Sequence, residues 1–169
     1  DFFGNHPKIA RPLRLLQVIG DHPKICKAIH FPLQSGNDRI LEMMNRGYGR
    51  DEFLDLAALM RESIPGLYLT TDIICGFPTE TEAEYLETED VVNRVQFDSA
   101  YIFKYSERKG THAAGRHTDD VPDEVKSRRV TSLVAVQREI ARARNQARIG
   151  ETQRVLVEGV SKKDEGEWR

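Results

Sequence analysis

The chain has 169 residues, enough for about one domain, since globular domains commonly hold about 100–200 residues. Hydrophobic residues make up 39% and charged residues 31%, so a core can form and a wholly disordered chain is excluded. The formal net charge of −2 argues against a protein that coats nucleic acid along its whole length. No run of about 18 apolar residues and no signal pattern is present, so we expect a cytoplasmic protein without membrane contact.

The two cysteines, Cys26 and Cys75, lie far apart and form no C-x-x-C or other close ligand spacing. The sequence therefore offers no self-contained site for zinc or for an iron–sulfur cluster. We expect both residues to be small buried thiols on two strands, without a disulfide between them.

Three apolar runs rich in β-forming residues predict strands, over residues 26–33, 67–75 and 98–105. Between the first two runs, a short apolar stripe around residues 40–44 precedes a helical pattern over residues 53–64, which Pro65 and Gly66 terminate. Strands that alternate with helices predict parallel strands joined by right-handed crossovers, and hence an α/β layer or barrel.

A further helix is predicted over residues 80–95, with Ala83, Leu86, Val91 and Val95 facing the core. Its remaining positions are strongly acidic, namely Glu80, Glu82, Glu84, Glu87, Glu89 and Asp90. A solvated helix exterior accounts for these charges, and acidic residues at a helix start interact favourably with the helix dipole.

A long helix is predicted over residues 122–149, with Pro122 in its first turn and Gly150 as its stop. Its apolar stripe comprises Val130, Leu133, Val134, Ile140 and Ala141. Basic residues outnumber acidic ones on this helix, namely Lys126, Arg128, Arg129, Arg138, Arg142, Arg144 and Arg148. They form either a solvated helix face or a face turned towards RNA.

Residues 153–160 alternate in polarity and predict a strand beyond this helix. We therefore place a domain boundary near Gly150, with a first domain over residues 1–150 and the start of a second over residues 151–169.

The three strands before the long helix are each followed by polar or glycine-rich sequence, at residues 34–37, 76–80 and 104–108. In parallel α/β folds, ligands bind where the C-terminal ends of the strands meet the following loops. The sequence therefore predicts a ligand site at one rim.

Residues 30–48 read H-F-P-L-Q-S-G-N-D-R-I-L-E-M-M-N-R-G-Y, residues 71–81 read T-D-I-I-C-G-F-P-T-E-T, and residues 103–111 read F-K-Y-S-E-R-K-G-T. These blocks resemble, in the same order, motifs of the radical-SAM tRNA methylthiotransferases of the MiaB type. Residues 155–163 resemble the opening strand of that family's RNA-binding TRAM domain. The resemblance implies a partial (β/α)6 radical-SAM (TIM-like) barrel, followed by the first strand of a small all-β TRAM domain.

Three positions depart from the family pattern: Gly49 replaces a helix-capping Thr, Cys75 a strand Val and Thr79 a loop Gly. The family's C-x-x-x-C-x-x-C loop, which holds the cluster that cleaves S-adenosylmethionine, is not in this sequence, nor is the domain that holds a second cluster. The resemblance thus implies two [4Fe–4S] clusters in the full-length protein, none of them held by this chain, which alone should be inactive.

The resemblance also implies a binding site for S-adenosylmethionine. Gln34 and Ser35, at a strand tip, can hydrogen-bond its ribose or amino-acid part. Arg46 offers a planar fork for its carboxylate, although a surface arginine at a helix end is the alternative.

Gly76, Phe77 and Pro78 allow backbone to approach the adenine ring closely, unless they merely form a tight turn. Lys104 and Tyr105 leave the last strand and either line the opening of the site or pack inside the barrel.

The resemblance implies transfer of a methylthio group to C2 of N6-isopentenyladenosine beside the tRNA anticodon, by radical chemistry that the cofactors carry. The implied partners of a monomeric enzyme are the anticodon stem-loop and an electron donor such as a flavodoxin-type reductant. Candidates for the phosphate contacts are Arg108, Lys109, Lys162 and Lys163.

Two other functions stay open. A RimO-type methylthiotransferase uses the same radical-SAM chemistry on a ribosomal-protein aspartate, although the sequences of residues 34–36 and 44–48 favour the tRNA enzymes. A non-catalytic RNA-binding module would use the basic helix together with Lys162 and Lys163.

Overall fold

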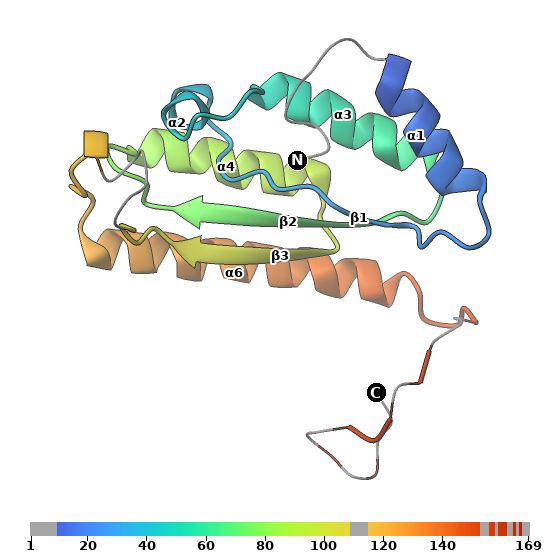
Figure 1. Cartoon of the computed structure of the whole chain (residues 1–169). Helices are drawn as coiled ribbons and strands as arrows, with labels where there is room; N and C mark the ends of the chain where they lie inside the picture. The colour runs from blue at the N-terminus through green and yellow to red at the C-terminus, as the bar shows by residue number, and fades with distance from the viewer. Residues whose placement is uncertain are drawn as a thin grey trace.

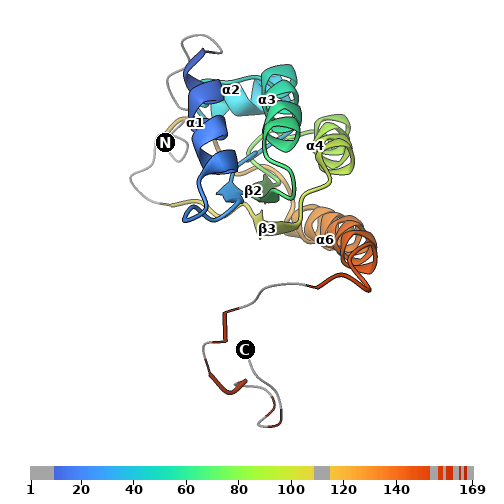
Figure 2. The ribbon, with the colours of Figure 1, turned by 90° about the vertical axis from the view of Figure 1, so that its right-hand side faces the viewer.

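The computed structural model describes residues 10–108, 115–152, 156–157, 159–161, 164 and 166. Its elements are, in order, α1 (Ala10–Asp21), β1 (Ala28–His30), α2 (Asp38–Met43), α3 (Arg50–Ser63), β2 (Tyr68–Cys75), α4 (Glu82–Val95), β3 (Ser99–Lys104) and α6 (Asp123–Gln146). The strands form a parallel sheet in the order β1-β2-β3. The helices follow one another around one side of this sheet, and α6 runs along β3 (Figure 1; Figure 2).

The two faces of the sheet differ in burial, because the helices pack on only one of them. On β2, alternate residues from Leu69 to Cys75 are buried beneath the helices, whereas Tyr68, at the start of the strand, is 40% exposed on the opposite face. On β3, Tyr101 and Phe103 are also exposed, and they pair in register with Asp72 and Ile74 of β2. The fold predicted from the alternating pattern, parallel strands with helical crossovers, is confirmed, and its helices cover one face.

An aromatic cluster fills the space between the sheet and α3. The ring of Phe53 stacks on Phe31 with 4.1 Å between the centroids, and the ring of Phe97 lies 6.3 Å away on a tilted plane. All three side chains are buried, together with Met60 and Leu69. Such large apolar side chains supply much of the hydrophobic stabilisation of a small core.

The first strand is shorter than the predicted run of residues 26–33. Pro32 has no backbone N–H to donate, so the regular ladder ends at His30, and pairing resumes only at a bridge between Gln34 and Ile73. Cys26 lies before the strand and is exposed, so its prediction as a buried strand residue was wrong; Cys75 is buried as predicted. No element was predicted over residues 10–21, where the structure has α1.

Helix α4 packs on the core through only part of the predicted face, in which Val91 and Val95 are buried as predicted. Ala83 and Leu86 are exposed, whereas Tyr85 and Thr88 are buried. Thr81 caps the helix and forms a capping box with Glu84, which starts the helix at Glu82 and leaves the preceding Glu80 outside it. Glu80, predicted on the acidic exterior, is in fact buried.

Helix α6 also differs from its predicted surface. Lys126 and Arg129, both counted in the solvated or RNA-facing set, are only 4% and 3% exposed. Leu133 and Ile140 are buried as predicted. The helix ends at Gln146, before the predicted end at residue 149, and the chain then passes through turns to Gly150.

The strand predicted over residues 153–160 lies largely outside the described residues, and so do the basic residues predicted on its exit loop. The described part of the chain therefore leaves the domain boundary as a prediction. Within that part, no helix has both the length and the apolar character to cross a membrane.

A helix cap comes from a neighbouring helix. Gly49, the N-cap residue of α3, has no side chain to bond the first turn, and Asp38 of α2 accepts a hydrogen bond of 2.6 Å from the backbone N–H of Arg50 instead. A Cβ at position 49 would lie 3.0 Å from this Asp38 oxygen. The departure from the usual Thr is therefore matched by a cap from another element.

The loop after β1 packs directly on the backbone of α4. A Cβ at Gly36 would lie 2.5 Å from Cα of Thr88 and 2.6 Å from the carbonyl oxygen of Glu87. We expect Gly36→Ala to lower the free energy of unfolding by about 1–3 kcal/mol, because backbone cannot move aside without shifting the helix. Urea unfolding measures this, and Gly115→Ala, which meets no atom within 4 Å, is the control. Equal stability of the two variants would contradict the prediction.

Candidate functional site

A pocket of about 620 Å³ lies at the C-terminal ends of the strands, where parallel α/β folds bind ligands. Its lining residues come from all three strand ends and from the segment after α2, namely Gln34, Met43, Met44, Asn45, Arg46, Asp72, Ile74, Phe77, Phe103, Lys104, Tyr105, Ser106 and Arg108. Apolar and aromatic side chains make up about half of this lining and polar or charged side chains the rest, so the pocket suits an organic ligand that also carries polar groups.

The pocket brings together many of the residues selected from the sequence, namely Gln34, Arg46, Phe77, Lys104, Tyr105 and Arg108. Others lie behind it. Ser35 is fully buried, and its hydroxyl oxygen accepts a hydrogen bond from the backbone of Asn37. Gly76 and Pro78 belong to the loop behind Phe77 and do not line the pocket. Lys109, Lys162 and Lys163 lie outside the described residues.

Gln34 is fixed by its backbone. Its φ angle of 66° lies in the left-handed region, which a residue with a side chain rarely adopts. Its N–H donates to Asp72 and its carbonyl accepts from Ile74, at 2.8 and 2.9 Å. These two bonds hold the strand end in a conformation that places Gln34 at the pocket.

Arg46 follows a left-handed residue, Asn45 at φ 56°, and its backbone N–H donates to the carbonyl of Leu41 at 2.9 Å. Its Nε is buried and has no hydrogen-bond partner among the described residues. A buried donor without a partner costs about 1–3 kcal/mol. Arg46 also lines the pocket, so its guanidinium lies beside the place where a ligand carboxylate would bind.

Aromatic rings form one wall. Phe77 meets Tyr105 edge to face with 5.2 Å between centroids, and the ring of His117 lies 6.1 Å from Phe77. The ammonium of Lys126 stands over Tyr105 at 5.3 Å from the ring centroid. Burial, followed by the nearby Asp119 carboxylate, raises the pKa of Tyr105, so its hydroxyl stays protonated at neutral pH.

Asp72 contributes a carboxylate to the pocket that the sequence analysis did not select. His30 lies beside it, with Nε2 3.2 Å from Asp72 Oδ2 and Nδ1 2.9 Å from Thr70 Oγ1. Thr71 and Asp72 are neighbours on β2, and strand alternation buries Thr71 and places Asp72 on the open face. That alternation was the signal available in the sequence.

The loop after β2 is braced by side chains from several elements. Arg39 of α2 donates to the Thr79 carbonyl and hydroxyl, both at 2.9 Å, while the Thr79 N–H donates to Asp120 at 2.7 Å. Thr79 has φ 65°, which explains why glycine is usual at this position. The bonds to Arg39 and Asp120 hold the threonine in this conformation.

The thiol of Cys75 ends β2 behind this loop. Burial, followed by the nearby Glu80 carboxylate, raises the pKa of Cys75 to about 12. The thiol is therefore protonated and unreactive at neutral pH, as befits a residue in the position of a strand valine. Within the described residues, no group of three or more His, Cys, Asp or Glu side chains could hold a metal ion.

Comparison with known proteins agrees with these features. The model of the Radical SAM superfamily matches residues 5–92. The tRNA-2-methylthio-N(6)-dimethylallyladenosine synthase of Akkermansia muciniphila is 49% identical over 161 residues, which cover 95% of this chain and 35% of the relative. The synthase of the same name from Moorella thermoacetica is 46% identical, covering 95% of this chain and 36% of the relative. The human mitochondrial tRNA methylthiotransferase CDK5RAP1 is 46% identical, covering 96% and 27%.

The chain belongs to the Radical SAM superfamily and, within it, to the methylthiotransferases of the MiaB type. The resemblance drawn from the sequence motifs is thereby confirmed. The chain spans about a third of the length of its bacterial relatives.

A solved structure shows the same fold. Coproporphyrinogen III oxidase (HemN) of Escherichia coli matches with a TM-score of 0.63 at 19% sequence identity, over 76% of this chain and 30% of that one. The predicted part of a radical-SAM barrel is therefore confirmed. In such a barrel the open face of the sheet, with Tyr101 and Phe103, is the inner one.

The ion pair that joins α2 to α4 should make stability depend on pH. Hydrogen bonds from Arg39, at 2.6 and 2.8 Å, lower the pKa of Glu84 to about 2. A carboxyl with a depressed pKa stabilises the fold above its unfolded pKa of about 4.3, and this stabilisation disappears as the pH falls towards 2.

We therefore expect wild type to be more stable than Glu84→Gln at pH 7 by at most about 3 kcal/mol, reduced by solvent screening at the half-exposed Arg39. The difference should shrink steadily below pH 4.5. Urea unfolding of both proteins between pH 7 and pH 3 measures it, and a difference that stays constant with pH would refute the assignment.

Proposed function

We propose that this chain forms the C-terminal part of the S-adenosylmethionine site of a tRNA methylthiotransferase, which adds a methylthio group to C2 of N6-isopentenyladenosine beside the anticodon. The observation that carries the proposal is the pocket at the strand ends, which is lined by the half-buried Arg46, whose Nε has no hydrogen-bond partner among the described residues. The relatives' names supply the substrate, a tRNA adenosine that bears a dimethylallyl group.

The residues present suit S-adenosylmethionine. Arg46 would bind its carboxylate, because a guanidinium fork matches a carboxylate in geometry and charge. The Gln34 amide can both donate and accept hydrogen bonds, which suits the ribose or the amino-acid part. Phe77 offers an aromatic face or edge to adenine, with Gly76 behind it. Ser35 and Pro78 would act through the shape of their loops.

The opposite side of the pocket would receive the substrate. Lys104 lies at the end of β3 and forms an exposed ion pair of 2.6 Å with Asp123 of α6. Tyr105 and Phe103 add aromatic surface at the opening. Arg108, exposed at the rim, would contact phosphate together with Lys109.

When bound, the iron–sulfur cluster supplies the electron that cleaves S-adenosylmethionine. We propose that its ligands, and those of a second cluster, belong to other parts of the complete protein, since this chain contains only Cys26 and the buried Cys75. This chain would then bind and orient the cofactor and would be inactive alone. A reductant of the flavodoxin type would be the electron donor, and the enzyme would act as a cytoplasmic monomer.

The proposal is tested by Arg46→Ala in the complete, cluster-loaded protein. We expect the affinity for S-adenosylmethionine to fall by about 1.5–3 kcal/mol, the usual value of a hydrogen bond to a charged group. Arg46→Lys should recover little, because an ammonium cannot replace the fork. Calorimetric titration measures the affinity.

The matched control for this experiment is Arg50→Ala. This arginine belongs to α3 and pairs with Glu87 and Asp90 on α4, without lining the pocket. If folded Arg46→Ala binds S-adenosylmethionine with unchanged affinity, the assignment of Arg46 to the carboxylate is refuted.

A second experiment concerns tRNA. The net charge of −2 requires that any grip on phosphates be local, and Lys162 and Lys163 are basic residues outside the long helix. Changing both to Ala in the complete protein should weaken tRNA binding and make the plot of log affinity against log salt shallower by up to roughly 1.4–1.8. Cleavage of S-adenosylmethionine without tRNA should not change. If the double variant keeps the wild-type tRNA affinity and salt slope, the two lysines do not contact tRNA phosphates and are ordinary surface charges.

A further inference from the structure

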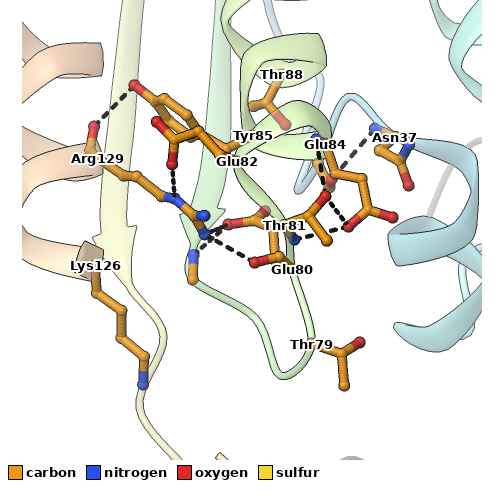
Figure 3. A network of polar contacts seen from close by, with 12 residues as sticks. Asn37, Thr79, Glu80, Thr81, Glu82, Glu84, Tyr85, Thr88, Lys126 and Arg129 are labelled. Atoms are coloured by element: carbon orange, nitrogen blue, oxygen red, sulfur yellow. Dashed lines mark hydrogen bonds and ion pairs between the residues drawn. The ribbon is translucent and has the colours of Figure 1, made fainter. Parts of the chain in front are cut away.

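A buried ion pair ties the loop after β2 to helix α6 (Figure 3). Nη1 of Arg129 lies 2.9 Å from Oε2 of Glu80, and the two side chains are only 3% and 1% exposed. The same nitrogen also donates to the carbonyl oxygen of Glu80 at 3.1 Å. Arg129 thus holds both the backbone and the side chain of one loop residue.

Glu80 in turn closes the loop on itself. Its Oε2 accepts a hydrogen bond of 2.7 Å from the backbone N–H of Gly76, four residues earlier. Between these two residues lie Phe77, which lines the pocket, and Thr79, whose backbone is left-handed. A displacement of Glu80 would therefore also displace the segment that contains Phe77.

Arg129 is itself immobilised from several sides. Its Nε donates to Glu82 at 3.1 Å, its guanidinium lies 5.5 Å from the centroid of the Tyr85 ring, and its carbonyl accepts from the Tyr85 hydroxyl at 3.1 Å. In Figure 3 the guanidinium points from α6 into the loop, between Glu80 and Glu82. Because these contacts restrict the Arg129 side chain, its hydrogen bonds to Glu80 also restrict the position of the loop.

Helix α6 also sets the position of Gly76. Any Cβ at this glycine would overlap Cγ of Lys126, one turn before Arg129 on the same helix. The φ angle of Gly76 is 77°, which also favours glycine. The nearby Lys126 side chain and the hydrogen bond to Glu80 therefore restrict this residue from two sides.

Net stability does not explain a pair of this kind. Removing two charges from water costs several kcal/mol per ion, and well-packed apolar residues in place of a buried pair are often equally stable or better. The pair does fix the orientation of Glu80 relative to Arg129, because the planar guanidinium bonds a carboxylate oxygen and the carbonyl oxygen of this one residue. The pair therefore specifies geometry.

We propose that Arg129 is a positioning residue for the cofactor: through Glu80 it fixes the Gly76–Phe77 segment at the place where the adenosine part of S-adenosylmethionine binds. This inference rests on the proposed function of the pocket. Arg129 lies behind the loop and does not line the pocket, so it acts only through the loop.

The test uses the complete, cluster-loaded enzyme and two ligands, S-adenosylmethionine and 5′-methylthioadenosine, which keeps the adenosine but has no carboxylate. Arg129→Met should weaken both by about 10-fold to 100-fold, since a displacement of about 1 Å can cost about 100-fold. Arg46→Ala should weaken only S-adenosylmethionine. In S-adenosylmethionine cleavage without tRNA, Arg129→Met should raise KM and leave kcat nearly unchanged.

Arg128→Met is the matched control. Arg128 is the neighbouring residue, pairs with the same Glu82 at 2.8 Å and is 57% exposed, but it does not contact the loop at Glu80. Its variant should bind both ligands like wild type. Arg129→Lys should recover only part of the affinity, because a single ammonium nitrogen cannot replace Nη1 at Glu80 and Nε at Glu82 at the same time.

A double variant, Glu80→Met with Arg129→Met, separates positioning from stability. It leaves no unpaired buried charge, so thermal stability should return towards wild type, while the affinity for 5′-methylthioadenosine should stay low. If that affinity recovers together with the melting temperature, Arg129 is structural only and the inference is overturned. If the wild-type enzyme binds neither ligand, the proposed function of the pocket is refuted. If the wild-type enzyme binds both ligands, the variants test the role of Arg129 alone.

Discussion

Buried charge determines how the rim of this sheet is built. Glu80 and Arg129 have almost no contact with water, and Arg129 is the cation that pairs with Glu80, so moving Arg129 alone would leave the Glu80 carboxylate in the interior without a counter-charge. The loop after β2 and helix α6 are therefore confined to one relative position. The placement of Gly76 against Lys126 and of Phe77 at the pocket follows from this constraint, because both residues lie in the same short loop.

The sequence predicted what depends on local pattern. The parallel strands, the helices after them and the site at the strand ends all follow from apolar periodicity, turn residues and the topology of parallel sheets. It did not predict the buried charges, since Lys126 and Arg129 were counted with the other basic residues of the long helix, which are normally solvated. Arg129 meets Glu80 across 49 positions of sequence, and no local pattern shows which of many charges will pair at such a separation. The core-facing side of α4 was predicted correctly at Val91 and Val95 but not in the first half of the helix, because Tyr85 and Thr88 lie among acidic residues and the apolar Ala83 and Leu86 suggested a different helical phase.

The departures from the family motifs are accommodated by their surroundings. Thr79 adopts a backbone conformation suited to glycine, and Arg39 and Asp120 bond its backbone and hydroxyl. Cys75 takes the place of a strand valine in the core, where burial keeps its thiol protonated. Neither change touches the pocket directly, since neither residue lines it. Motif positions in this loop thus have two separate roles, with Phe77 facing the ligand and its neighbours setting the backbone.

The cap at the start of α3 has a consequence for local unfolding. Because Asp38 supplies the hydrogen bond that Gly49 cannot, the first turn of α3 is complete only while α2 is folded. We therefore expect the two helices to open together, so that their amide hydrogens exchange with solvent through a shared opening. The connection between them contains Arg46, so a ligand that holds this arginine also suppresses that opening, and protection from exchange should extend from the pocket into the first turn of α3.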